Sequence, residues 1–69
     1  MDDFNLGLFI KEHRKVAGLT QLELANLAGV GKTTVFDIEK NKETVRWNNL
    51  LAILKVLNIE VQFKSPIYK

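Results

Sequence analysis

Residues 20–41 read Thr-Gln-Leu-Glu-Leu-Ala-Asn-Leu-Ala-Gly-Val-Gly-Lys-Thr-Thr-Val-Phe-Asp-Ile-Glu-Lys-Asn, a pattern that predicts two short helices joined by one tight turn. Thr20 is suited to cap the first helix, because its side-chain oxygen can accept a hydrogen bond from a backbone amide that has no partner within the helix. Gly29 can adopt the left-handed backbone angles that end a helix, and Val30 then fills the corner.

The apolar residues of this stretch fall on one face of each predicted helix. Leu24, Ala25 and Ala28 are three or four positions apart, and so are Val35 and Ile38, which places each set on one side of its helix. The second helix keeps an outward face that is polar apart from one aromatic ring, and its residues are Lys32, Thr33, Phe36, Asp37 and Lys40. A helix presented in this way fits the major groove of DNA, which is wide enough to admit it.

Further helices are predicted on both sides of this pair. Asn5 is suited to cap a helix from about residue 6 to residue 17, with His13 among the residues on its inner side. Asn41 tolerates left-handed backbone angles and is expected to end the helix before it. The segment 47–57 is expected to form a fourth helix that covers the others, with the apolar residues Trp47, Leu50, Leu51, Ile53, Leu54 and Leu57.

The hydrophobic period changes after residue 58. Ile59, Val61 and Phe63 alternate with polar residues, which is the pattern of a half-buried β-strand, here over residues 59–64. A lone strand leaves its amide and carbonyl groups without partners, so it needs a second strand. An identical chain can supply that strand across a two-fold axis, and we therefore expect a homodimer. The alternatives are a frayed tail or pairing with residues 4–6.

Length and composition restrict the classes of protein. We expect one domain over residues 1–69, with a helical body at 5–58 and a dimerisation strand at 59–64. The chain has no cysteine and one histidine, so we expect no disulfide, metal site or cofactor. Its apolar runs are far shorter than the roughly 20 residues that span a bilayer. Because it starts with acidic residues rather than the basic head of a signal peptide, a cytoplasmic protein is expected.

The formal net charge of +2 is small, but the charges are unevenly placed. Asp2 and Asp3 stand at the N-terminus, whereas the middle of the chain is locally basic. The basic residues of this middle part are Lys11, Arg14, Lys15, Lys32, Lys40, Lys42 and Arg46. Such clustering favours a nucleic acid as the partner.

Enzymatic alternatives fail on spacing. Gly31, Lys32 and Thr33 match the end of a phosphate-binding Walker A motif, but that motif needs a glycine where the chain has Asn26. It also needs a strand in front of it, whereas residues 22–28 have a helical period. No serine, cysteine or carboxylate is placed to act with the histidine as a catalytic pair. We therefore predict that the protein is not an enzyme.

Four short motifs carry a family resemblance: Gly18-Leu-Thr-Gln, Glu23-Leu-Ala, Ala28-Gly-Val and Thr34-Val-Phe-Asp-Ile-Glu. Through them, residues 5–59 resemble the Xre, or lambda-repressor-like, helix-turn-helix family. The resemblance implies a mainly α fold, a four-helix helix-turn-helix domain, to which the predicted C-terminal β-strand that pairs across a dimer is added. It also implies a sequence-specific repressor that binds a palindromic operator in double-stranded DNA.

A narrower resemblance concerns the C-terminal half. Residues 44–57, followed directly by the predicted strand, are similar to HipB-like antitoxins. That resemblance implies an intersubunit sheet, repression of the antitoxin's own operon, and a HipA-like kinase toxin as a bound partner. The alternative is a stand-alone Xre-family regulator with no toxin. RNA binding is a weaker alternative, because the chain lacks the aromatic sheet or glycine loop of single-strand readers.

The family resemblance also implies roles for individual residues. The implied DNA-binding set is Gln21, Gly31, Lys32, Thr33, Thr34, Phe36, Asp37, Lys40, Asn41, Lys42 and Thr44. Within it, Gln21 is expected on a phosphate, and Lys32 and Thr33 are expected against base edges. Arg14 and Glu39 stand where family members often have a partly buried ion pair.

Three positions depart from the family pattern. Gly31 replaces the usual Ser or Thr that caps the reading helix. Asp37 is acidic where polar or basic residues are common; it could accept from cytosine N4 or pair locally with Lys40. Phe36 is large and apolar at a position that is usually small and polar. It could touch a thymine methyl group or pack against a partner chain.

Overall fold

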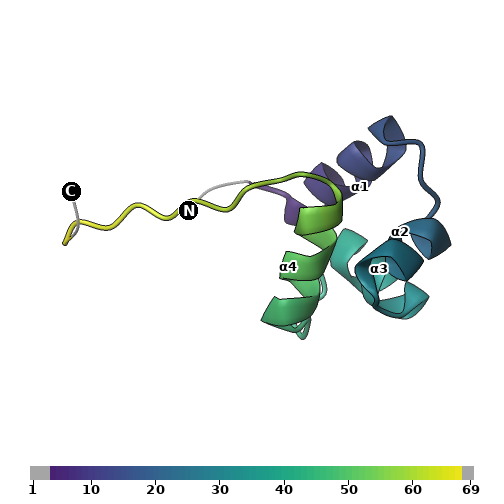
Figure 1. The fold of residues 1–69 in the computed structure, drawn as a ribbon. Helices are drawn as coiled ribbons and strands as arrows, with labels where there is room; N and C mark the ends of the chain where they lie inside the picture. The colour runs from purple at the N-terminus through teal and green to yellow at the C-terminus, as the bar shows by residue number, and fades with distance from the viewer. Residues whose placement is uncertain (1–3, 68–69) are drawn as a thin grey trace.

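The computed structural model describes residues 4–67, and within them the chain forms four helices (Figure 1). They are α1 (Leu6–Val16), α2 (Gln21–Ala28), α3 (Lys32–Glu39) and α4 (Trp47–Val56). Asp2, Asp3 and the two ends of the predicted domain at 1–69 lie outside the described residues. None of the four helices is long and apolar enough to cross a membrane.

The helix boundaries follow from capping groups. The side chain of Asn5 accepts a hydrogen bond of 2.9 Å from the amide of Leu8 at the start of α1. At the start of α2, Thr20 Oγ1 accepts from the amide of Glu23 at 3.1 Å, and the Glu23 carboxylate accepts from the amide of Thr20 at 2.8 Å. This reciprocal capping box satisfies two amides that have no partner in the helix. Gly29 ends α2 with φ of 73°.

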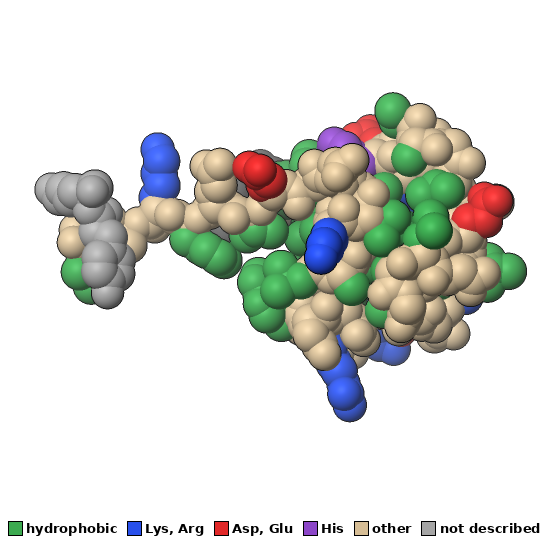
Figure 2. All heavy atoms as spheres, in the orientation of Figure 1, with side chains coloured by type: hydrophobic (Ala, Val, Ile, Leu, Met, Phe, Trp, Pro, Cys, Tyr) green, Lys and Arg blue, Asp and Glu red, His purple; other side chains and the backbone are tan. Residues whose placement is uncertain are grey.

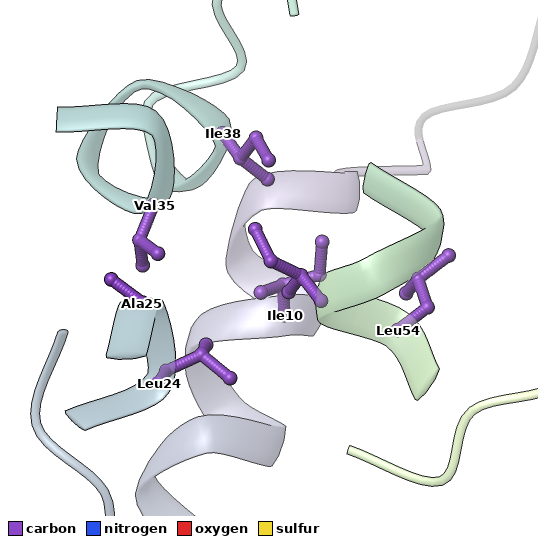
Figure 3. Packing of buried hydrophobic residues seen from close by; sticks show 7 residues of the cluster. Ile10, Leu24, Ala25, Val35, Ile38 and Leu54 are labelled. Carbon is purple, nitrogen blue, oxygen red and sulfur yellow. The ribbon is translucent and has the colours of Figure 1, made fainter. Parts of the chain in front are cut away.

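One hydrophobic core joins the four helices (Figure 3). Its buried members are Ile10, Leu24, Ala25, Val35, Ile38, Ile53 and Leu54, so every helix contributes at least one. Figure 3 shows Val35 of α3 pointing towards Ala25 of α2, the contact between a small and a β-branched residue. The predicted inward faces of α2 and α3 are therefore confirmed.

The buried face of α1 differs from the pattern prediction. Gly7, Ile10 and Arg14 are the buried residues of this helix. His13, which was expected on the inner side, is exposed and its ring stacks on Phe9 with 4.3 Å between ring centroids. The prediction is wrong because a count of apolar residues passes over a glycine and an arginine, and these two define the side of α1 that packs on α3.

The C-terminal residues leave the helical body as an extended segment (Figure 1). At the start of this segment, the amide of Ile59 still donates a hydrogen bond to the carbonyl of Leu54 at 2.9 Å. Residues 4–67 contain no β-strand, so the strand predicted at 59–64 is not formed in the single chain. The physical reason is that a strand needs a ladder partner, and the alternative partner, residues 4–6, is instead occupied in starting α1.

Trp47 also differs from its predicted place in the core. It is the first residue of α4 and remains 54% exposed. Its ring lies beside that of Phe63 in the extended segment, with 6.3 Å between the ring centroids. The core side of α4 is occupied instead by Ile53 and Leu54. The N-terminal end of α4 and the extended segment thus share an apolar surface that the single chain leaves open.

Candidate DNA-binding surface

Helix α3 lies across the molecule with one side buried and the other in solvent. Val35 is fully buried and Ile38 is 3% exposed, so these two residues fix the inner side. The outer side carries Lys32 and Thr33 in its first turn and Phe36 in the next. The residue that precedes the helix is Gly31, whose lack of a side chain leaves the first amides of α3 without a side-chain cap. Free amides at a helix N-terminus attract phosphate.

A buried ion pair holds the far end of α3. Arg14 Nε donates to Glu39 Oε2 at 2.6 Å, and Arg14 Nη2 donates to Glu39 Oε1 at 3.1 Å. The two side chains are only 10% and 4% exposed. Arg14 also donates from Nη1 to the carbonyl of Leu19 at 2.9 Å, and Gln21 Nε2 donates to Glu39 Oε1 at 3.0 Å. One carboxylate therefore ties α3 to both α1 and α2.

This arrangement sets the charge states of the pair. Burial raises the pKa of Glu39, but the hydrogen bonds from Arg14 and Gln21, together with the charge of Arg14, outweigh burial and hold that pKa below its ordinary value. The hydrogen bond to Glu39 raises the pKa of Arg14 against the opposing effect of burial. Both groups are consequently charged at neutral pH, and a fully paired ion bridge fixes the position of α3.

A close backbone approach supports the same end of α3. Gly7 of α1 packs so tightly on α3 that a Cβ atom added to it would lie 2.5 Å from the carbonyl oxygen of Glu39. Its amide donates to Asn41 Oδ1 at 2.8 Å, and Asn41 Nδ2 donates to Asn5 Oδ1 at 2.7 Å. Asn41, which has φ of 60°, therefore ends α3 and bonds to the start of α1.

The basic residues that follow Phe36 make contacts other than the pair of Asp37 and Lys40 that was considered from the sequence. Asp37 Oδ2 lies 3.7 Å from the Nζ of Lys42, not against Lys40. Lys40 Nζ instead lies over the Phe36 ring, 5.5 Å from its centroid, in a cation–π contact. The local pairing expected between Asp37 and Lys40 is thus wrong, because Lys40 points along the helix towards Phe36 while the chain after Asn41 turns back and brings Lys42 to Asp37.

Two of the open recesses beside α3 gather most of the predicted DNA-binding residues. The first, between α2 and α3, is lined by Gln21, Lys32, Thr33 and Phe36. The second is lined by Thr34, Asp37, Thr44, Val45, Arg46 and Asn49. Gly31 stands at the start of α3, Lys40 and Lys42 follow its end, and Asn41 is turned towards α1.

Two polar residues that line the second recess were not in the predicted set. Arg46 is exposed at the start of α4 and borders the second recess, and Asn49 lines it from the next turn. Their only sequence signal was the position of Arg46 within the basic middle of the chain. Gln21, in contrast, was predicted on a phosphate, and the structure shows its amide donating to Glu39. Among residues 4–67 no cluster of His, Cys, Asp or Glu could hold a metal ion.

The outward α3, the tight turn at residue 29 and the four-helix core define a helix-turn-helix fold. A family model described as Helix-turn-helix matches residues 10–64. The chain belongs to this Xre-like helix-turn-helix family, whose members are DNA-binding regulators.

Individual relatives agree with this assignment. The chain is 32% identical over 62 residues to the HTH-type transcriptional regulator y4mF of Sinorhizobium fredii. The aligned residues make up 90% of this chain and 82% of the relative. It superposes on the restriction-modification controller protein C.AhdI of Aeromonas hydrophila with a TM-score of 0.74 and 32% identity, over 81% of this chain and 85% of the controller. A chain of the HipA-HipB-O2-O3 complex gives a TM-score of 0.80 at 24% identity, covering 96% and 93% of the two chains, a likeness of fold.

Proposed function

We propose that this protein is a sequence-specific DNA-binding transcriptional repressor that reads its operator with α3 and catalyses no reaction. The observation that carries the proposal is the outer side of α3. Lys32, Thr33 and Phe36 are exposed there, on a helix whose inner side is buried and whose end is held by the ion pair of Arg14 and Glu39. A rigid helix with exposed hydrogen-bonding groups in its first turn is the arrangement that reads a major groove.

The residues around α3 divide into base readers and phosphate binders. Lys32 can donate to guanine O6 and N7. The hydroxyl of Thr33 beside it can either donate to a base edge or accept from one. The free amides after Gly31 face outward and suit a phosphate. The exposed residues that follow α3 suit the flanking backbone, and they are Lys40, Lys42, Thr44 and Arg46, whereas the side chain of Asn41 is bonded to α1 and to Asn5.

Gln21, Thr34 and Asp37 are half-buried residues beside this surface. Gln21 lines the first recess while its amide remains bonded to Glu39. Asp37 lines the second recess together with Thr34. We assign Gln21 and Thr34 to phosphate contacts, because each of them lines a recess beside α3. Asp37 is the residue that can accept from cytosine N4, once its exposed partner Lys42 binds a phosphate instead.

We further propose that the working form is a homodimer on a palindromic operator. The extended segment carries two exposed apolar residues, Val61, 41% exposed, and Phe63, which is 80% exposed and lies beside the exposed ring of Trp47. Figure 2 shows hydrophobic side chains gathered where this segment leaves the helical body. Two copies that pair their residues 59–64 antiparallel would satisfy the backbone groups of both segments and cover this apolar surface.

The dimer has a geometric consequence for the operator. Two reading helices related by a two-fold axis enter successive major grooves when they stand about 34 Å apart, so half-sites should recur at about 10 bp or a multiple of it. The operator should therefore be an inverted repeat. A footprint of the purified protein on the region upstream of its own gene tests this spacing.

The division of labour on α3 can be tested with two lysine variants. Lys32→Ala should weaken binding to the operator by about 1–3 kcal/mol and relax its specificity, because a base contact is lost. Lys42→Ala should weaken operator and random duplex alike and reduce the salt slope by about one, because a phosphate contact is lost. Fluorescence anisotropy at two salt concentrations measures both quantities.

The control for these variants is Lys15→Ala, which removes an equal charge from α1 away from the surface defined above. It should change neither the specificity nor, beyond a small amount, the salt slope. Equal losses on operator and random duplex for all three variants would contradict a base-reading role for α3. Absence of any difference between operator and random duplex for the unaltered protein would remove the proposed function itself.

A second function, that of a HipB-like antitoxin, is proposed on one observation. Residues 44–57, followed by the extended segment, are similar in sequence to that group. In this proposal the protein represses its own operon and also binds a HipA-like kinase toxin. Co-purification of a kinase encoded in the adjacent reading frame supports it, whereas a gene without such a neighbour leaves a stand-alone Xre-family regulator acting in the cytoplasm.

A further inference from the structure

Phe36 is the aromatic residue of α3, and 46% of it is exposed to solvent. It follows Lys32 and Thr33 by four and three positions, so the three side chains share one side of the helix. Lys32 and Thr33 carry hydrogen-bonding groups, whereas Phe36 carries none. An apolar ring at the centre of a polar reading surface needs an apolar partner to offset its exposure to water.

The surroundings of Phe36 give it a fixed place. Lys40 Nζ lies over the ring at 5.5 Å from the centroid. Beside the ring, an open recess of about 300 Å³ is lined by Gln21, Lys32, Thr33 and Phe36. Gln21 is itself held by its hydrogen bond of 3.0 Å to Glu39. The ring therefore forms one wall of a preformed notch between α2 and α3.

We propose that Phe36 is a specificity-determining residue that contacts the 5-methyl group of a thymine, at one position in each operator half-site. This inference rests on the proposed DNA-binding function and names the base that the first recess takes. In the major groove, thymine alone presents an apolar group, while every other base edge there consists of hydrogen-bond donors and acceptors. A phenyl ring against such an edge would leave donors or acceptors without partners, which is unfavourable. The methyl group has no such cost.

The competing role for Phe36 is packing against a partner chain. It would make Phe36 important for the oligomeric state and indifferent to the methyl groups of the DNA. The position of the ring argues against it, because Phe36 lies on the same side as Lys32 and Thr33, whereas the exposed residues Val61 and Phe63 belong to the extended segment at the other end of the chain. The experiment below separates the two roles.

The test replaces each thymine of the operator, one at a time, by deoxyuridine, which removes only the 5-methyl group. A duplex selected from a random library by the purified full chain serves as the operator. At one thymine per half-site, the unaltered protein should lose about fourfold in affinity, since burial of one such carbon group is worth about 0.8 kcal/mol. Phe36→Ala should bind the thymine and deoxyuridine duplexes equally at that position.

Two controls keep this test decisive. Leu22→Ala removes a side chain that is 52% exposed on α2 and does not line the recess, so it should keep the fourfold difference. Phe36→Gln, which keeps a good helix former at the position, repeats the test if Phe36→Ala is poorly folded. Light scattering should give both Phe36 variants the same oligomeric state as the unaltered protein, measured as the molar mass in solution.

Three results would overturn the inference. The first is equal affinity of the unaltered protein for all thymine and deoxyuridine duplexes. The second is a loss of affinity on removal of the methyl group that persists in both Phe36 variants. The third is a change in the molar mass of those variants measured by light scattering. Each leaves the proposed DNA-binding function intact, because the operator is still bound. Failure of the unaltered protein to select any duplex would instead remove the proposed function, and this inference with it.

Discussion

Glu39 illustrates how much one side chain can organise in a small domain. Its two carboxylate oxygens accept from Arg14 on α1 and from Gln21 on α2, so three helices meet at one group. The sequence resemblance predicted a pair of Arg14 and Glu39, but the share of Gln21 follows only from the distance between α2 and α3. A charge buried in this way is stabilising only while every partner is present.

The lowered pKa of Glu39 makes stability depend on pH. A carboxyl group with a lower pKa in the folded than in the unfolded chain adds stability above its unfolded pKa, about 4.3, and that stability is lost as pH falls through the folded value. We therefore expect the free energy of unfolding in urea to be level from about pH 7 to pH 5 and to fall below that range, as the unfolded chain begins to bind the proton.

Two variants isolate the contribution of Glu39. Glu39→Gln should be destabilised at neutral pH by roughly 3 kcal/mol, because Arg14 is left buried without a counter-charge, and its stability should fall less steeply on acidification. Glu43→Gln changes an exposed carboxylate and should retain the acid profile of the unaltered protein. Identical acid profiles for Glu39→Gln and Glu43→Gln would contradict this account.

Gly7 is the second residue whose importance depends on one contact. Gly7→Ala should destabilise the protein by about 1–3 kcal/mol, because the new methyl group would press on the Glu39 carbonyl and push α1 away from α3. The gain from the helix propensity of alanine is small there, because Gly7 lies in the first turn of α1 rather than in the helix interior. Urea unfolding measures the change, and Leu8→Ala, at a half-exposed neighbour, is the control with a smaller expected loss. A Gly7→Ala variant more stable than the unaltered protein would rule out the close approach.

At the scale of elements, the helix boundaries were readable from the chain because caps are local. Asn5 and Thr20 begin α1 and α2, and Gly29 and Asn41 end α2 and α3, as predicted. Each cap depends on a side chain and on amides or backbone angles within three residues of it. The buried side of α1 was not readable, because its packing on α3 requires a residue without a side chain, Gly7, which no apolar pattern records.

The turn between α2 and α3 offers a matched pair of glycine substitutions. Both glycines have open space around the position of a Cβ atom, but Gly29 has φ of +73° and Gly31 has φ of −77°. Gly29→Ser should therefore cost about 1–2 kcal/mol, because an L-residue is strained there. Gly31→Ser should add a few tenths to 1 kcal/mol, because serine caps a helix and lowers the entropy of the unfolded chain. Thermal unfolding compares the two, and a shift of the same sign in both would contradict the assigned backbone angles.

At the scale of the whole molecule, we propose that the extended segment controls the oligomeric state. We expect the unaltered protein to be a dimer at micromolar concentration, measured by light scattering. Phe63→Glu should shift it towards monomer, because a charge then stands where the apolar surface with Trp47 is covered by the second copy. Gln62→Glu places the same charge on the opposite face of an alternating segment and should leave the dimer largely intact.

The oligomeric prediction has a clear contrary result. A monomeric unaltered protein at micromolar concentration would exclude the pairing of residues 59–64. Dissociation by Gln62→Glu to the same extent as by Phe63→Glu would show that charge alone, not the face of the segment, controls assembly. In the first case α3 would have to read its half-site without a symmetric partner, and the affinity for an inverted repeat would equal that for a single half-site.

The sequence by itself determined the four helices, the caps that begin α1 and α2, and the exposed positions of Lys32, Thr33, Phe36 and Lys40 on α3. These features follow from the helical period and from hydrogen bonds between near neighbours in the chain. Only the tertiary structure decided that Gly7 lies on the buried side of α1, that Gln21 is bonded to Glu39, and that Lys40 lies over Phe36. Those outcomes depend on how closely whole helices approach one another, and that distance is set by the packing of the complete core rather than by any local pattern.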